Sequence, residues 1–169
     1  SSGTMYGRTT TYIVGDLLNN ASVLNSGNTS VEGDIINNGQ IVPTLPDQVI
    51  YNFIVYGDFT NNNGAVYSNL VHDATYIGGN LLNNGQFDAS ELWFHNDPPN
   101  GFPARPQTVS GSGTFSISSL VINNLHTSGV TLDVPLTIDD LSFYFAGSGK
   151  LYIGNNDLTV RQKSTFPTN

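Results

Sequence analysis

The chain of 169 residues carries thirteen acidic and five basic side chains, so its net charge is −8, and only 11% of its residues are charged. A nucleic-acid surface needs clustered Lys and Arg, and the basic residues here are scattered, which excludes nucleic acid as a partner. The absence of cysteine excludes disulfides, zinc–thiolate sites and cysteine catalysis. No apolar run reaches the length that crosses a bilayer, so membrane insertion is not expected.

In chain order, residues 1–10 are expected to be an irregular lead-in, and a repeat follows. One motif occurs four times, as VGDLLNN at 14–20, EGDIINN at 32–38, YGDFTNN at 56–62 and GGNLLNN at 78–84. We call it the repeat motif. Its glycines at 15, 33, 57 and 79 are 18, 24 and 22 residues apart. A period near twenty residues indicates one structural unit that stacks on copies of itself.

When the four copies are aligned on glycine, apolar residues recur at even spacings, so they share one face of an extended chain. The polar residues between them suit an outer face. The inward columns are Ile13, Val31, Val55 and Ile77; Leu17, Ile35, Phe59 and Leu81; Asn19, Asn37, Asn61 and Asn83; and Val23, Ile41, Ala65 or Val66, and Phe87. Stacked Asn amides hydrogen-bond along such an axis, so the third column is a predicted structural ladder.

No stretch has the periodicity of an amphipathic helix, and the 21 asparagines also disfavour helix. An antiparallel sandwich would need two-residue hairpin turns and a core that differs from strand to strand. Here the same residue types return at the same place in each unit. The sequence therefore predicts an all-β chain folded as a single-stranded parallel β-helix, or β-solenoid, of about eight coils of about 20 residues. We expect residues 1–169 to be one domain and a fragment of a longer chain.

Two proline-containing segments interrupt the pattern. Residues 43–48 are a short excursion, and residues 95–106, which hold four prolines, are predicted to be an inserted loop that leaves the coil. Residues 161–169 are expected to be an irregular tail.

The second half has its own motifs: QTVSGSGTF at 107–115, LVINN at 120–124, SGVTL at 128–132, PLTI at 135–138 and SGKLYIGNNDLTV at 148–160. Together with GNLLNNG at 79–85, they resemble the repeat regions of very large Bacteroidetes cell-surface proteins, adhesin-like chains of which many are type IX secretion cargo. The resemblance covers residues 11 to 160. It implies a right-handed β-helical stalk or adhesin segment that is displayed on the bacterial surface and has no catalytic residues.

Asp16, Asp34 and Asp58, followed by Asn80, occupy one outward column. Stacked carboxylates in successive turns are a candidate Ca²⁺ site, because hard oxygen ligands suit this cation. The alternative is that each Asp caps its own glycine turn while hydrated. We favour the caps, since the nonapeptide of calcium-binding rolls is absent, and we expect neither a metal nor any other cofactor.

The insert and the strand before it hold the densest aromatic and charged cluster, with candidate contact residues Trp93, Phe94, His95, Phe102 and Arg105. Aromatic platforms flanked by polar groups bind sugar rings or anchor protein partners. The alternative is that the strand residues belong to the core and the loop packs down on it.

Catalysis has little support, because the basic residues and histidines share no motif spacing, and no known catalytic motif is present. We therefore expect a non-enzymatic structural and adhesive segment of an exported protein. It would act as a stiff stalk or spacer and contact surface, with flanking repeats of the same chain and a surface glycan or protein as partners. One alternative is a carbohydrate-binding or carbohydrate-active β-helix that uses residues 93–106. Another is a subunit of a surface filament or a cargo of the secretion machinery.

Overall fold

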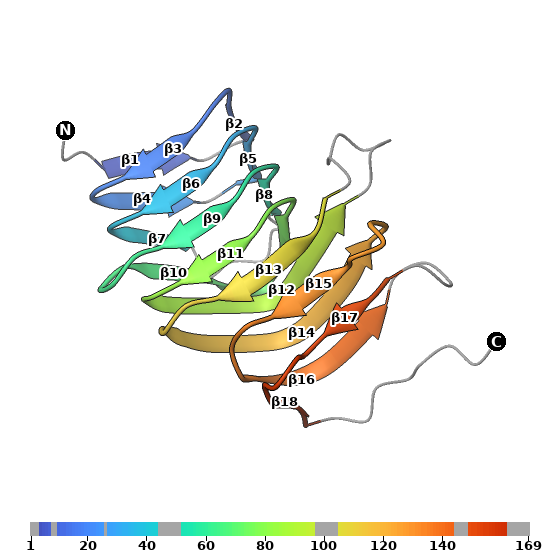
Figure 1. Ribbon diagram of the computed structural model, residues 1–169. Helices are drawn as coiled ribbons and strands as arrows, with labels where there is room; N and C mark the ends of the chain where they lie inside the picture. The colour runs from blue at the N-terminus through green and yellow to red at the C-terminus, as the bar shows by residue number, and fades with distance from the viewer. Residues whose placement is uncertain are drawn as a thin grey trace.

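The computed structural model describes residues 4–7, 10–25, 27–43, 52–96, 105–143 and 149–161. Every regular element in these residues is a β-strand, and the strands stack in parallel as a β-solenoid of about six turns (Figure 1). The prediction of an all-β parallel solenoid is therefore confirmed. The number of turns is about six in place of the predicted eight.

The strands form two parallel sheets that share the axis of the solenoid. Sheet A has eleven strands: β1 (Thr4–Gly7), β2 (Thr11–Ile13), β4 (Ser22–Asn25), β5 (Thr29–Val31), β7 (Gln40–Pro43), β8 (Phe53–Val55), β10 (Val66–Ile77), β12 (Gln86–Asn96), β14 (Thr114–Asn124), β16 (Leu136–Phe143) and β18 (Leu158–Val160). Sheet B has seven: β3 (Leu17–Asn19), β6 (Ile35–Asn37), β9 (Phe59–Asn61), β11 (Leu81–Asn83), β13 (Gln107–Ser110), β15 (Val130–Leu132) and β17 (Leu151–Tyr152).

The register places like residues over like, as the repeat predicts. In sheet B, Leu17 pairs with Ile35, Ile35 with Phe59, Phe59 with Leu81, and Leu81 with Val109. All of these except Leu17 are completely buried, and Leu17, in the first coil, is half-buried. Each coil therefore buries its apolar face against the coils above and below it.

One predicted column is wrong in the third coil, where Tyr67, and not the residue at 65 or 66, pairs with Ile41 and Phe87. Two inserted residues, Asn63 and Gly64, form the turn before β10, and Gly64 has a φ of 79°. Because the insertion is two residues long, the inward and outward alternation survives it, and Tyr67 lies in the core.

The coils are longer than the period near twenty suggested, which is why there are fewer of them. Equivalent residues of successive coils are 18, 24, 22 and 28 residues apart along the first five coils. The longest step, from Asn80 to Thr108, contains the insert at 95–106.

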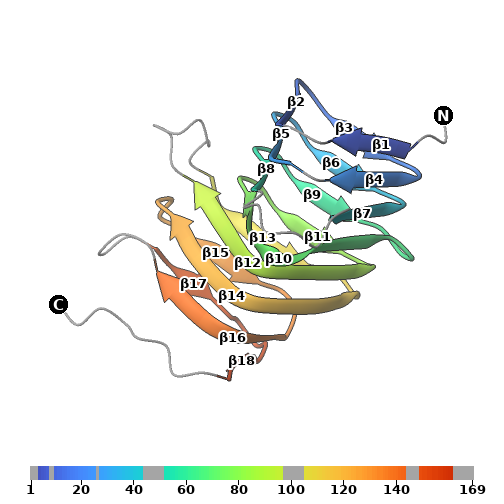
Figure 2. The same cartoon turned by 180° about the vertical axis from the view of Figure 1, so that it is seen from behind.

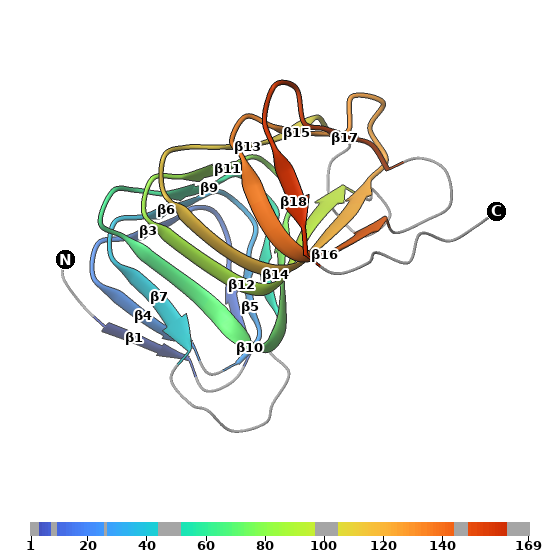
Figure 3. The same ribbon diagram turned by 90° about the horizontal axis from the view of Figure 1, so that it is seen from below.

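The cross-section of the solenoid changes along its length. In the first three coils each turn uses two separate short strands of sheet A, such as β4 and β5, whereas β10 continues through both positions as one strand of twelve residues. Figure 2 shows β10, β12, β14 and β16 as long strands on the side away from sheet B, and Figure 3 shows them bending around a corner of the coil. The polypeptide thus needs one turn fewer per coil in the second half.

Aromatic rings fill the core where the short strands give way to long ones. The ring of Tyr67 lies 4.6 Å from Phe87, 5.0 Å from Phe59 and 5.4 Å from Phe53 between centroids, and all four are buried. The buried Tyr67 hydroxyl lies 2.6 Å from Oγ1 of Thr75, so its polar end is satisfied inside the core.

Four segments are predicted to be irregular: residues 1–10, 43–48, 95–106 and 161–169. Residues 4–7 of the expected irregular lead-in form β1, which pairs with β4, and residues 95 and 96 of the expected loop belong to β12. These predictions are wrong because parallel pairing with the neighbouring coil extends the strands beyond what the local pattern indicates. Residues 44–51, 97–104 and 162–169, which include most of both predicted loops and of the predicted tail, lie outside the described residues.

Candidate functional site

The aspartates of the repeat motif join successive coils. Oδ1 of Asp16 accepts the backbone N–H of Asp34 at 2.9 Å, and Oδ1 of Asp34 accepts that of Asp58 at 2.8 Å. The series continues when Oδ1 of Asp58 accepts the N–H of Asn80 at 2.8 Å and Oδ1 of Asn80 accepts that of Thr108 at 2.9 Å. Each side chain therefore caps the turn of the following coil and not, as was predicted, its own turn. We call this series the aspartate column.

This cap explains the glycine of the motif. A Cβ atom on Gly33 would lie 2.1 Å from Oδ1 of Asp16, and one on Gly57 would lie 2.2 Å from Oδ1 of Asp34. Backbone atoms of the preceding glycine lie within 2.7 Å of the same points. The glycine is needed at these positions because the previous coil occupies the space that a side chain would fill.

The four asparagines predicted as a ladder are hydrogen-bonded in series inside the coil. Nδ2 of Asn19 donates to Oδ1 of Asn37 at 2.7 Å, Asn37 donates to Asn61 at 2.8 Å, and Asn61 donates to Asn83 at 2.8 Å. Their side chains are at most 5% exposed, so these bonds lie where an unsatisfied amide would be strongly unfavourable. We call this series the inner ladder.

Each amide of the inner ladder also binds the backbone. The second N–H of Asn61 donates to the carbonyl of Gln86 at 2.8 Å, and the equivalent N–H of Asn37 donates to Val66 at 3.1 Å. Oδ1 of Asn37 accepts the N–H of Gly39, two residues further on, at 3.2 Å. Because both donors and the acceptor are used, Asn satisfies this buried turn in a way that an apolar residue cannot.

A second amide series runs on the outside of the same turn with the opposite polarity. Nδ2 of Asn38 donates to Oδ1 of Asn20 at 2.8 Å, and Nδ2 of Asn62 donates to Oδ1 of Asn38 at 2.6 Å. The inner amides donate toward the C-terminal end of the solenoid, whereas these outer amides donate toward the N-terminal end. The two dipole rows therefore oppose each other, which limits the field that either would build up along the axis.

Arg105, one of the predicted contact residues, binds Asp58, the last aspartate of the column. Its Nη2 atom lies 3.0 Å from Oδ1 of Asp58, and its Nε donates to the carbonyl of Gly78 at 3.1 Å. The side chains of Arg105 and Asp58 are 34% and 40% exposed, so solvent screens the pair. Arg105 therefore ties the segment before β13 to Asp58 and to the backbone at Gly78.

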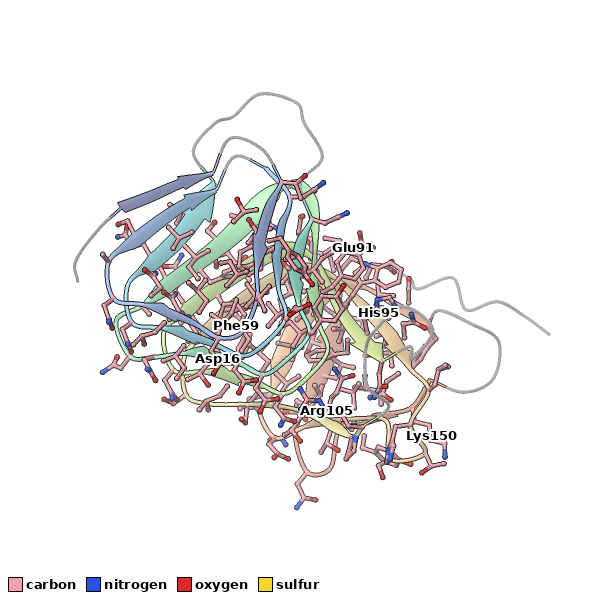
Figure 4. All side chains as sticks on the ribbon, turned by 90° about the horizontal axis from the view of Figure 1, so that it is seen from above. Asp16, Phe59, Glu91, His95, Arg105 and Lys150 are labelled. Carbon is pink, nitrogen blue, oxygen red and sulfur yellow. The ribbon has the colours of Figure 1, made fainter. Side chains whose placement is uncertain are left out.

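The other predicted contact residues do not lie together on one surface. Phe94 is completely buried in the core, so its prediction as a contact residue is wrong; it follows the inward parity of β12. Trp93 and His95 lie on the outer face of β12, half-buried, with ring centroids 6.2 Å apart. Phe102 lies outside the described residues. Figure 4 shows Phe59 within the coil, Glu91 and His95 along one side, and Arg105 at a different edge.

Tyr76, which is not among the predicted contact residues, completes the outer aromatic cluster. Its ring lies 5.3 Å from Trp93 and 5.7 Å from His95, because Tyr76 and Trp93 pair directly between β10 and β12. Glu91 points to the same face two residues before Trp93. Alignment of Tyr76–Ile77 with Trp93–Phe94 would have revealed this outward position. We refer to Tyr76, Trp93, His95 and Glu91 as the aromatic patch.

Metal and charge features are sparse in the described part of the chain. It contains no group of three or more His, Cys, Asp or Glu side chains placed to hold a metal ion.

Tyr12 donates its hydroxyl hydrogen to Glu32, and this hydrogen bond to a carboxylate raises the pKa of Tyr12 above its usual value. Among the described residues there is no helix of the length and apolarity needed to span a bilayer.

Comparison of the chain with protein-family models, with curated proteins and with solved structures finds no match.

Proposed function

We propose that this chain is a stiff, non-catalytic spacer and contact segment of an exported bacterial surface protein, wound as a right-handed parallel β-helix. The observation that carries the proposal is the axial register, in which each coil lies on the next and is tied to it by amide and carboxylate side chains. The right-handed winding follows the strong preference of parallel β crossovers. The surface location follows from the resemblance of residues 11–160 to adhesin-like repeat regions.

Three rows of side-chain hydrogen bonds run parallel to the axis through the repeat motif: the aspartate column, the inner ladder and the outer amides. They add to the backbone bonds of the two sheets. Together these rows and the backbone bonds of both sheets tie each coil to the next, and such a rod resists bending because bending must stretch some of these bonds. β1 and β18 lie at opposite ends of sheet A, so length is set by the number of coils (Figure 1).

Because the chain has no cysteine, two introduced cysteines can be spin-labelled selectively. The width of the distance distribution between the two labels then measures stiffness. Leu18 in β3 and Tyr152 in β17 are 59% and 46% exposed at opposite ends of sheet B, and both can be replaced by Cys and spin-labelled. Six strand steps predict a mean separation of about 30 Å with a narrow distribution. In a second protein residues 11–28 are duplicated and only the outermost copy of residue 18 carries the label, which should lengthen the distance by about 5 Å. A broad distribution, or no lengthening, would contradict the spacer.

Surface display needs a separate test in the source organism. An antibody raised against the segment should label intact cells, and external protease should remove the epitope without lysis. Labelling that requires permeabilised cells would contradict display while leaving the rod geometry intact.

A second candidate function, glycan binding, is favoured by the aromatic patch. The partly exposed residues Tyr76 and Trp93, on the same outer face as Glu91, combine an apolar surface with hydrogen-bond acceptors, as sugar-binding surfaces do. On a glycan array, saturable binding that is lost in Trp93→Ala and Tyr76→Ala would support this function. Leu70→Ala, which removes an exposed apolar side chain elsewhere on β10, is the matched control. Binding that survives both patch substitutions would exclude the patch.

A further inference from the structure

The N-terminal edge of the solenoid, at the turn between β2 and β3, lacks the contacts that every later copy of this turn receives. Asp34, Asp58 and Asn80 each donate their backbone N–H to an aspartate Oδ1 of the preceding coil. Asp16 holds the same place in the first coil, and no described residue accepts its N–H. A hydrogen-bond donor with a fixed direction is thus presented at the end of the rod.

The asparagine rows show the same pattern of one missing neighbour. Oδ1 of Asn37 accepts both a ladder amide from Asn19 and a backbone N–H, whereas Oδ1 of Asn19 accepts only the N–H of Ala21 among the described residues. On the outside, Nδ2 of Asn38 has an acceptor in Asn20, and Nδ2 of Asn20 has none in the described residues. The edge therefore presents two donors and one acceptor in a defined arrangement.

The space beside Gly15 is open where the later glycines of the motif meet the preceding coil, and Gly15 also differs from them in its positive φ of 92°. At Gly33, Gly57 and Gly79 the position of a Cβ atom lies 2.1 to 2.2 Å from an aspartate Oδ1 of the preceding coil. At Gly15 nothing lies within 4 Å of that position. Beside it, the core residues Ile13 and Leu17 are only partly buried. An incoming group of the right shape would fill this space, satisfy the donors and bury both side chains.

We propose that this edge, residues 13–20, is a docking surface for one further β-coil that carries the repeat motif, with Asp or Asn at the position of Asp16 and Asn at the positions of Asn19 and Asn20. Such a coil supplies an Oδ1 for the N–H of Asp16, an Nδ2 for Oδ1 of Asn19 and an Oδ1 for Nδ2 of Asn20. The inference deepens the proposed spacer function, on which it rests for its biological meaning, by naming the chemistry of the flanking coil.

In the described part of the chain, the last strand of sheet B does not offer this edge the acceptor that it needs from a second copy. Its C-terminal coil carries Tyr152 in the aspartate column, because Thr108 pairs with Thr131 and Thr131 with Tyr152. Tyrosine has no short side-chain acceptor to reach the N–H of Asp16. The docking surface is therefore selective for coils with the motif and against head-to-tail assembly of this chain.

Amide hydrogen exchange of the wild-type chain gives the first test. The N–H of Asp16 should exchange at least tenfold faster than those of Asp34, Asp58 and Asn80, which are bonded to the preceding coil. An Asp16 amide as slow as the other three means that the edge is already covered, and this result overturns the proposal. The same result accompanied by concentration-dependent growth in light scattering would assign the edge to a second copy.

The second test adds the missing coil. A chain in which residues 11–28 are duplicated places a motif-bearing coil on the original edge, and the original Asp16 amide should then slow at least tenfold. The matched control has Asp16→Ala and Asn19→Ala in the added copy only, and it should leave that amide fast. Equal protection in both chains, or loss of the wild-type β-sheet spectrum in the motif-bearing extension, would overturn the proposal. Stiffness between labels at residues 18 and 152 is a separate measurement, so the spacer can fail while this edge is verified.

Discussion

The two parts of the solenoid, residues 11–85 and residues 86–160, contribute strands to the same two sheets, but their turns are stabilised in different ways. In the first half most strands have three or four residues, and the turns are joined by the aspartate column and the asparagine rows. In the second half β12 pairs with β14 over a stretch that runs from Gln86 and Thr114 to Asn96 and Asn124. Short strands leave many turn N–H groups to be satisfied, and side chains do this where the backbone does not.

The change occurs at one coil. Gln107 occupies the column position of Gly79, and its buried side chain donates to the carbonyls of Ile77 at 2.8 Å and Gly79 at 3.0 Å. Asn124 donates to Oε1 of Gln107 at 2.8 Å, so a new amide cluster replaces the repeat motif. The fourth copy of the motif, at 78–84, lies between the long strands β10 and β12, so the motif ends where Gln107 takes the place of its glycine and not where the strands lengthen.

The largest expected effect is loss of an inner-ladder amide. Asn61→Ala removes three side-chain hydrogen bonds from a completely buried site and leaves the carbonyl of Gln86 and the amide of Asn37 short of partners. We expect the free energy of unfolding to fall by about 2–4 kcal/mol in urea titration. Asn62→Ala, which removes the adjacent outward amide, is the control and should cost about 0.5 kcal/mol. Similar losses for the two substitutions would show that the inner ladder contributes no more than the outer amides.

The glycines of the motif come next. Gly57→Ala drives a methyl group to 2.2 Å from the Asp34 carboxylate and 2.5 Å from the carbonyl oxygen of Gly33, and should destabilise the chain by about 2–3 kcal/mol. Gly15→Ala meets nothing within 4 Å, although its φ of 92° is unfavourable for Ala, and should cost about 1 kcal/mol. Thermal unfolding of both proteins gives the comparison. If Gly15→Ala proved the more damaging, backbone conformation and not the neighbouring coil would explain the glycines.

Much of this architecture could be predicted from the sequence, because a repeat constrains every coil at once. The inward column of Leu17, Ile35, Phe59 and Leu81 needed only even spacing and alignment on glycine. The partner of each Asp did not follow, since sequence spacing does not say whether a side chain reaches its own turn or the next.

The candidate contact site was predicted less well. Adjacent residues on a strand point to opposite faces, so Phe94 entered the core while Trp93 and His95 stayed outside. Tyr76 was missed because it joins the patch from the coil before, at a distance of 17 residues from Trp93. The strand register, which decides such neighbours, was evident only where the motif itself was repeated.

Substitution of Arg105, which precedes β13, should have a smaller effect on the free energy of unfolding. Arg105→Gln removes the ion pair with Asp58 and the bond to the carbonyl of Gly78, and should lower the free energy of unfolding by about 1 kcal/mol at low salt. The difference should shrink in 1 M NaCl, where charges are screened within about 3 Å. Arg161→Gln, which breaks a 3.5 Å pair with Asp139 in a side chain that is 68% exposed, is the matched control and should change little. An effect of Arg105→Gln that is independent of salt would assign its role to packing.

The smallest effect concerns the charge of the aspartate column. Asn80 already fills this column in the fourth coil and caps Thr108 with the same geometry, so an amide oxygen serves as well as a carboxylate oxygen. Asp34→Asn should therefore keep the cap, relieve repulsion from Asp16 and Asp58, and change the free energy of unfolding by only a few tenths of a kcal/mol. Asp34→Ala removes the cap and should cost about 1 kcal/mol. Each protein is unfolded in EDTA and again in millimolar Ca²⁺, because a calcium site in this column would stabilise the wild type and not Asp34→Asn. Stabilisation of the wild type alone would mean that the carboxylates serve as cation ligands as well as caps, and it would reinstate the metal interpretation of the column.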